Sequence, residues 1–383
     1  MTLYADIFLQ FFRLGALSFG GPAAHLVNFE RRFVTDKAWL STAQYRQLVA
    51  LCQFLPGPAS SQVGIGIGLQ RGGYPGALLA FLGFTLPSFV FMTLAGVYGL
   101  QWLGPAALQG ALCALAAIVA HAIWQMSQSF LTDWRRRTFA VVGFGVFLLA
   151  LTMFWQMLLL ALFALCGTRL LRQDATEVIQ PWRGTSALSL PLLIVLLLLL
   201  LVLPVSSALW SDVPSLQFIQ QYFQAGTFVF GGGHVVLPLL EQSVGTNMPQ
   251  TDFLAGYAAA QLMPGPIFSF VAYLGAMTQG IAGAILATFA VFLPGALLVC
   301  AIWPWWHRLG QYPGVFGAVS AVNCAVVGLL ASTWWQFILP HAAMTSWHWL
   351  LMLSGFLLLL RNWCKAMLLV PAAMVATSIP TLF

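Results

Sequence analysis

Residues 53–63, QFLPGPASSQV, interrupt a long apolar stretch with two prolines and a glycine, and residues 261–271, QLMPGPIFSFV, repeat the pattern. Proline removes a helical hydrogen bond and glycine permits a sharp turn, so each Pro-Gly-Pro is expected to break a helix. In hydrocarbon the freed backbone groups are tolerated only inside protein or beside a wet cavity. Two such breaks at corresponding positions predict a binding site between two halves of the chain, with kinks that serve only packing as the competing interpretation.

The sequences around the two breaks are copies of one unit. FFRLGALSFGGP (11–22) matches YFQAGTFVFGGG (222–233), and GYPGALLAFLGFTLP (73–87) matches GIAGAILATFAVFLP (280–294). Together with the Pro-Gly-Pro segments, these matches occur in one order at offsets of 211, 208 and 207 residues. We therefore expect four parts: a first repeat over 1–168, a cytoplasmic linker over 169–187, a connecting transmembrane helix over 188–210 and a second repeat over 211–383.

The composition indicates a membrane protein. Of the 383 residues, 60% are apolar and 6% are charged, against roughly 25% charged in a soluble domain. Long runs of Leu, Ala and Phe without alternation exclude a β-barrel, which leaves an all-α polytopic membrane helical bundle. The net charge of +6 comes from short basic clusters between apolar segments, which orient membrane proteins and do not indicate nucleic-acid binding. The six cysteines show neither metal nor disulfide spacing, so we expect no metal and no cofactor.

The placement of the basic residues bears on topology. If every apolar segment crosses the membrane, the loop charges Arg31, Arg32, Lys37 and Arg46 face away from the ten in other loops. If residues 5–29 and 43–70 are instead re-entrant hairpins, all fourteen lie on one side, which the positive-inside rule favours. We favour the hairpins. In either case an odd number of crossings separates the halves, so the second repeat is predicted to have inverted topology.

Groups beside the helix breaks are the candidate anion ligands. A half-helix that begins after a Pro-Gly-Pro break directs its amide groups and positive dipole end inward, which suits an anion. The predicted substrate-binding set contains the breaks, the polar side chains beside them, the repeated glycine pairs and one arginine: Arg13, Gly20, Gly21, Gln53, Pro56, Gly57, Pro58, Ser60, Ser61, Gln62, Gly231, Gly232, Gln261, Pro264, Gly265, Pro266 and Ser269. The alternatives are interhelical hydrogen bonds for the polar side chains and close helix packing for the glycines.

Arg13 lies well inside an apolar segment, where a charge normally faces a partner or an aqueous path. Its guanidinium fork matches a tetrahedral dianion. The alternatives are that Arg13 snorkels to the cytoplasmic surface or pairs with Asp6.

Four residues are candidates for coupling transport to a proton. Glu30 and Glu241 occupy equivalent positions after the first apolar segment of each repeat, and His25 and His234 lie near the breaks. Partly buried carboxyls and imidazoles titrate near neutral pH. Exposed loop acids and structural histidines are the alternatives.

Four longer stretches carry a resemblance to a known family: LGALSFGGPAAHL (14–26), residues 49–88, FGGGHVVLPLLE (230–241) and GYAAAQLMPGPIFSFVAYLGA (256–276). They resemble the two halves of the chromate ion transporter family, in its long two-unit form, over about residues 8–100 and 218–300. The resemblance implies a multi-pass protein of the bacterial inner (plasma) membrane that exports chromate and confers chromate resistance, with sulfate as competitor. It also implies a secondary transporter, and no motif for an ATPase is present in the sequence.

Other functions stay open beside this one. Sulfate or another inorganic oxyanion shares the charge and shape of chromate, so uptake or exchange of such an anion is the main alternative. The sequence contains no His-Glu-x-x-His or Gly-x-Ser-x-Gly motif, and we do not expect an enzyme. A channel differs from a transporter in its turnover rate, which no motif encodes.

Overall fold

The computed structural model describes residues 2–19, 21–100, 104–149, 153–171, 187–210, 212–229, 236–245, 248–306 and 313–378. Within these ranges the regular structure is helical and contains no strand, which confirms the all-α prediction. Five of these helices are long and apolar enough to cross a membrane, so the chain folds as a polytopic membrane bundle. Most of the predicted linker lies outside the described residues, as do four predicted site residues, namely Gly20, Gly231, Gly232 and His234.

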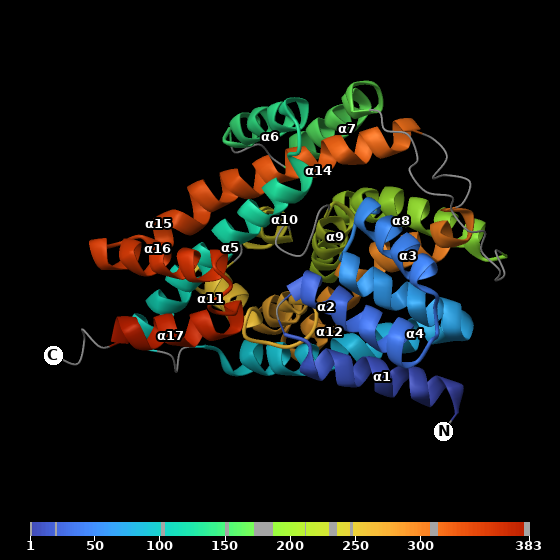
Figure 1. Cartoon of the computed structure of the whole chain (residues 1–383), viewed down its shortest axis with the longest axis horizontal. Helices are drawn as coiled ribbons and strands as arrows, with labels where there is room; N and C mark the ends of the chain where they lie inside the picture. The colour runs from blue at the N-terminus through green and yellow to red at the C-terminus, as the bar shows by residue number, and fades with distance from the viewer. Residues whose placement is uncertain are drawn as a thin grey trace.

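The two halves contain corresponding helices in the same order (Figure 1). The first half has α1 (Leu3–Leu17), α2 (Gly21–Phe29), the π-helix η1 (Glu30–Asp36), α3 (Thr42–Phe54), α4 (Ala59–Tyr98), α5 (Pro105–Phe130), α6 (Trp134–Phe147) and α7 (Met153–Leu170). After α8 (Ser189–Leu209), the second half has α9 (Pro214–Thr227), α10 (Val236–Ser243), α11 (Gln250–Ala260), η4 (Ile267–Ser269), α12 (Phe270–Ile302), η5 (Trp303–Trp305), α14 (Pro313–Thr333), η6 (Trp334–Ile338), α15 (Leu339–Ala342), α16 (Ser346–Leu360) and α17 (Ala366–Ser378).

The first apolar segment folds back on itself as a hairpin. Arg32 near its end donates to the side-chain oxygen of Gln10 at 2.6 and 2.9 Å, and the Lys37 ammonium lies 3.5 Å from the Asp6 carboxylate. Helix α1 and the α2–η1 segment therefore run antiparallel. The chain returns to the end of the molecule from which it started, as the re-entrant prediction requires.

The second apolar segment forms a similar hairpin around the first Pro-Gly-Pro. Leu48 of α3 packs against Gly66 of α4 so closely that a Cβ at Gly66 would collide with it. Arg71, where the segment ends, lies over the ring of Trp39, where it begins, at 5.2 Å from the ring centroid. In the first half both ends of the second segment therefore lie together, as the hairpin prediction expects.

Helices α4 and α12 each consist of two arms joined by a tight turn. The turn in α4 uses Gly73 at φ 64° and ψ −158°, and the turn in α12 uses Gly280 at φ 63° and ψ −153°. Both backbones lie in the region that favours glycine. Behind the first turn Gly68 packs directly against Gly76, and the corresponding glycines of α12 repeat this contact. The two halves of the sequence thus share one fold.

Packing divides the helices into two bodies, and each body contains elements of both repeats. The broken-helix core consists of α1–α4 and α9–α12, where α4 packs against α12. The outer bundle consists of α5–α7 and α14–α17, where α5 packs against α16 and α17 while α14 packs against α6 and α7. Several glycine contacts hold the outer bundle together across the repeats; for example, Gly110 meets Ala373, and Gly167 meets Gly317. Figure 1 shows α1–α4 on one side and α6, α7, α14, α16 and α17 on the other.

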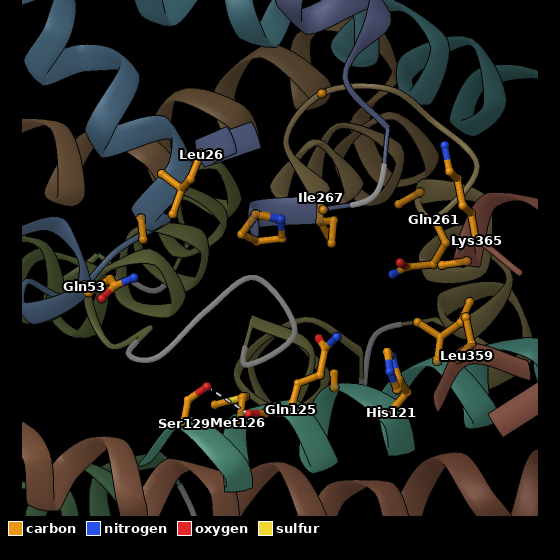
Figure 2. A pocket seen from close by; sticks show the side chains of 18 of the residues that line it. Leu26, Gln53, His121, Gln125, Met126, Ser129, Gln261, Ile267, Leu359 and Lys365 are labelled. Atoms are coloured by element: carbon orange, nitrogen blue, oxygen red, sulfur yellow. Dashed lines mark hydrogen bonds between the residues drawn. The ribbon is translucent and has the colours of Figure 1, made fainter. Parts of the chain in front are cut away.

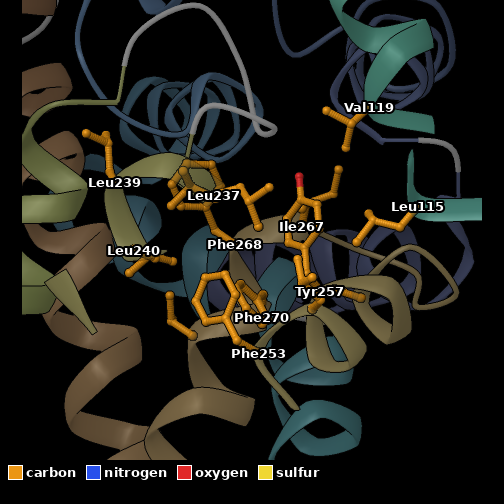
Figure 3. Close-up of a cluster of buried hydrophobic side chains, with 14 of the residues drawn as sticks. Leu115, Val119, Leu237, Leu239, Leu240, Phe253, Tyr257, Ile267, Phe268 and Phe270 are labelled. Carbon is orange, nitrogen blue, oxygen red and sulfur yellow. The ribbon is translucent and has the colours of Figure 1, made fainter. Parts of the chain in front are cut away.

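The broken-helix core and the outer bundle meet through a cluster of buried apolar side chains (Figure 3). Leu115 and Val119 of α5 lie in this cluster with Tyr257 of α11, which is fully buried. Phe253 of α11 contacts Phe337 of η6, with ring centroids 5.9 Å apart. We call this group the sealing cluster, because its buried apolar side chains fill the contact between the two bodies.

Candidate functional site

A cavity of about 710 Å³ lies between the broken-helix core and the outer bundle (Figure 2). The polar or glycine residues that line it from the core are Gly21, Gln53, Gly57, Gln261 and Gly265, and those from the bundle are His121, Gln125, Ser129, Asn362 and Lys365. Figure 2 shows Gln53 and Gln261 towards opposite ends, with the α5 side chains along one side. Both Pro-Gly-Pro breaks therefore face a single cavity, as the duplicated motif predicts.

Four helices begin at the cavity wall. Their first residues, Gly21 of α2, Ala59 of α4, Ile267 of η4 and Ala366 of α17, all line the cavity, and η4 runs directly into α12. The first amides of a helix have no partner within the helix and carry its positive dipole end. Several such ends around one space create an environment that favours an anion.

Each break is closed by a hydrogen bond to the other repeat. The amide of Gly57 donates to the carbonyl of Val229 at 2.6 Å, and the amide of Gly265 donates to the carbonyl of Ser18 at 3.0 Å. Both glycines have positive φ, +126° and +91° respectively, which a residue with a side chain adopts only with strain. Ser18 and Val229 are themselves equivalent positions in the repeat, so the two bonds form a crossed pair.

Side chains behind the breaks stabilise this crossing. The amide group of Gln62 donates to the carbonyl of Pro56 at 2.8 Å and to that of Gly295 in the other repeat at 3.2 Å. The hydroxyl of Ser269 lies 2.6 Å from that of Ser88, again across the repeats. Gln62 and Ser269 therefore make the interhelical hydrogen bonds that were the alternative to ligand binding.

Only part of the predicted site lines this cavity. Among the described residues of the prediction, the two glutamines and the glycines at 21, 57 and 265 do so. The flanking prolines, Pro56, Pro58, Pro264 and Pro266, shape the breaks without lining the cavity. Three serines, Ser60, Ser61 and Ser269, are buried behind the breaks and lie outside it.

Arg13 is exposed and does not line the cavity. Asp6 accepts hydrogen bonds from Gln10 at 2.7 Å and Lys37 at 3.5 Å, so in the described part of the chain Arg13 is not its partner. The structure therefore does not bring Arg13 to the cavity.

The described candidates for proton coupling also lie away from the cavity. His25 is fully buried, and the centroid of its ring lies 5.1 Å from that of the Phe84 ring. Glu30 is partly buried in η1, and Glu241 is partly buried near the end of α10. None of the three lines the cavity.

The outer bundle supplies cavity residues that the motif analysis missed. His121, Gln125 and Ser129 follow one another at intervals of four, which places them on one face of α5. Polar side chains at this spacing in an otherwise apolar segment indicate a face that lines a polar cavity, so the sequence alone could have identified these residues. Lys365 precedes α17 in a short loop, and its sequence context indicated only a topological role.

Comparison with known proteins shows the family to which the chain belongs. A family model described as chromate transporter matches residues 5–168 and 216–378. A probable chromate transport protein of Synechococcus elongatus is 29% identical over 332 residues, which cover 84% of this chain and 81% of the relative. A chromate transport protein of Cupriavidus metallidurans is 29% identical over 336 residues, covering 85% and 80%. One of Pseudomonas aeruginosa is 26% identical over 337 residues, covering 86% and 80%. No solved structure matches the chain.

Proposed function

The chain belongs to the chromate transporter family, and on that premise we propose that it exports chromate across the bacterial inner membrane and so confers chromate resistance. Relatives named chromate transport proteins align with it over most of both chains. The observation that carries the proposal is the cavity, at which four helices begin and to which no described Asp or Glu contributes. Such a space favours a small dianion over a cation.

Chromate would bind in this cavity between the two breaks. In this conformation the proposed core ligands are Gln53 and Gln261, because the backbone amides of Gly57 and Gly265 already donate to the other repeat. Amide groups donate hydrogen bonds without fixed charge, so the core holds the anion without the strength of an ion pair. That balance suits a transporter, which must release what it binds. Sulfate, with the same charge and shape, is the proposed competitor.

Transport would proceed by movement of the broken-helix core relative to the outer bundle. The cavity lies between the two bodies, and the sealing cluster joins them beside it. Separation of this cluster would expose the anion on the other face of the membrane. We further propose that the repeats have inverted topology, since an inverted pair offers two equivalent conformations of opposite access.

The proposed activity is secondary transport and not catalysis, because the family is a family of transporters. The driving force would then be an ion gradient or exchange. Glu30, Glu241, His25 and His234 stay candidates for a coupling proton, as does the imidazole of His121, which does line the cavity.

The proposal is tested in proteoliposomes that contain the purified protein. Uptake of labelled chromate should be saturable and inhibited by sulfate. Replacing both Gln53 and Gln261 by Ala should raise KM roughly tenfold or more, since each glutamine loses a hydrogen bond to a charged group. Gln128→Ala is the matched control, because Gln128 lies on α5 and does not line the cavity. Flux equal to that of empty vesicles would refute the proposal.

The second candidate is transport of sulfate or another inorganic oxyanion, as uptake or exchange. The neutral amides of the core can recognise an anion only by its charge and tetrahedral shape. Chromate and sulfate share both properties, so these amides do not distinguish them. Growth of expressing cells on chromate separates the directions, because export raises resistance and uptake raises sensitivity. A protein that carries sulfate and ignores chromate would replace the first proposal by the second.

A further inference from the structure

The cavity has an uneven distribution of charge. From the core it receives glycines, glutamines and apolar residues, none of them charged. From the outer bundle it receives one charged side chain, Lys365, and no described carboxylate lines either wall. Helix ends and amides stabilise an anion by partial charges, but they leave the net charge of a bound dianion uncompensated.

Lys365 is positioned by the start of α17. Its carbonyl accepts hydrogen bonds from the amides of Leu368 at 2.9 Å and Leu369 at 3.2 Å, so its backbone forms the first turn of that helix. The next residue, Ala366, also lines the cavity. The positive end of α17 and the Lys365 side chain therefore both lie at the wall of the cavity.

The ammonium group of Lys365 is available to a ligand. The side chain is exposed, and no carboxylate in the described part of the chain pairs with it. Two other basic residues are engaged away from the cavity. Lys37 pairs with Asp6. Arg361, in the same loop as Lys365, stacks over Trp363 at 5.1 Å and does not line the cavity.

We infer that Lys365 is a specificity-determining residue, whose ammonium compensates the charge of the anion bound in the cavity. This inference rests on the proposed function. It assigns to Lys365 the role of binding the charged anion, which the sequence suggested for Arg13. Lysine is a compact charge on a flexible chain, so it can follow the anion over several positions. Because Lys365 belongs to the outer bundle and the glutamines to the core, the anion bridges the two bodies that move.

The test is direct binding of chromate to the purified full-length protein, measured by equilibrium dialysis. Lys365→Gln should weaken binding roughly 10- to 100-fold, the effect of losing a hydrogen bond to a charged group. Arg361→Gln removes the same charge from the same loop and should bind like the wild type. Perchlorate, a tetrahedral monoanion, should compete less well than sulfate in the wild type, and Lys365→Gln should reduce this difference.

A second variant keeps the test valid if Lys365→Gln folds poorly. Lys365→Cys, in a background whose six native cysteines are replaced, is treated with a methanethiosulfonate that adds either an aminoethyl or a neutral ethyl group. Binding should recover with the aminoethyl group alone. Equal recovery with both reagents, or wild-type affinity in Lys365→Gln, would overturn the inference. If the wild type itself binds no chromate, the proposed function fails, and the inference fails with it.

Discussion

The amide of Gly57 lies 2.6 Å from the carbonyl oxygen of Val229, so a break in the first repeat is closed by the second. The reciprocal bond, from Gly265 to Ser18, closes the other break at 3.0 Å. Each opened helix end thus finds its partner in the other copy of the unit. This exchange satisfies backbone groups that would be costly inside a membrane.

Gly57→Ala should destabilise the protein. A Cβ at this position would lie 3.0 Å from the Cα of Gly295 and 2.8 Å from the Gln62 amide, at a φ of +126°. We expect a loss of about 1–3 kcal/mol in the free energy of unfolding, with a lower melting temperature in detergent. Gly145→Ala is the control, since open space surrounds Gly145. Equal melting of Gly57→Ala and the wild type would contradict the crossed arrangement.

Crosslinking across the sealing cluster should stop transport. Phe253 belongs to the core and Phe337 to the outer bundle, with ring centroids 5.9 Å apart. A double cysteine variant at these positions, joined by a short bifunctional thiol reagent, should retain anion binding and lose flux. Ser88→Cys with Ser269→Cys is the control, because that pair joins two repeats within one body. Unchanged flux in the crosslinked Phe253–Phe337 variant would rule out movement between the two bodies.

His121→Gln should flatten the pH dependence of anion binding. A protonated imidazole adds positive charge to the cavity, so affinity in the wild type should rise as pH falls below neutral. The variant lacks the titrating group and should lose this rise. Sulfate is the suitable ligand, because it keeps both charges over this range. His341→Gln is the control, since His341 lies outside the cavity lining and contacts the carbonyl of Phe337. If the affinity of the His121→Gln variant still rises as pH falls, another titrating group is responsible for the rise.

Thiol labelling should place the two repeats in opposite orientations. Thr35, in η1 at the end of the first hairpin, and Gln250, in the corresponding part of the second repeat, are both exposed. Single cysteines at these positions in a cysteine-free background should react with an impermeant maleimide from opposite faces of the membrane. Labelling of both from one face would exclude inverted topology.

The backbone architecture was largely predictable from the sequence because proline and glycine act locally. Pro56 and Pro264 mark the breaks, and the charges at Lys37 and Arg71 favoured hairpins that the structure contains. The hydrogen bond between Gly57 and Val229 was not predictable, since the motif of one repeat does not show which residue of the other repeat accepts the bond.

The site was predicted less completely than the fold. Gln53 and Gln261 line the cavity as expected. Ser269 does not, because its hydroxyl contacts that of Ser88 in the other repeat, a partner that the motif itself does not encode. Lys365 was missed for another reason. A loop lysine beside an apolar helix has the same sequence context whether it orients the protein in the membrane or faces a cavity.

The crossed bonds also constrain how the chain is made. When the ribosome has completed the first repeat, the amide of Gly57 still lacks its acceptor, since Val229 has not been synthesised. The helices of the first repeat therefore lack this hydrogen bond in the bilayer until the second repeat has been synthesised and inserted. A prematurely terminated chain would keep an unsatisfied donor in lipid, and membrane quality control could recognise it by that defect.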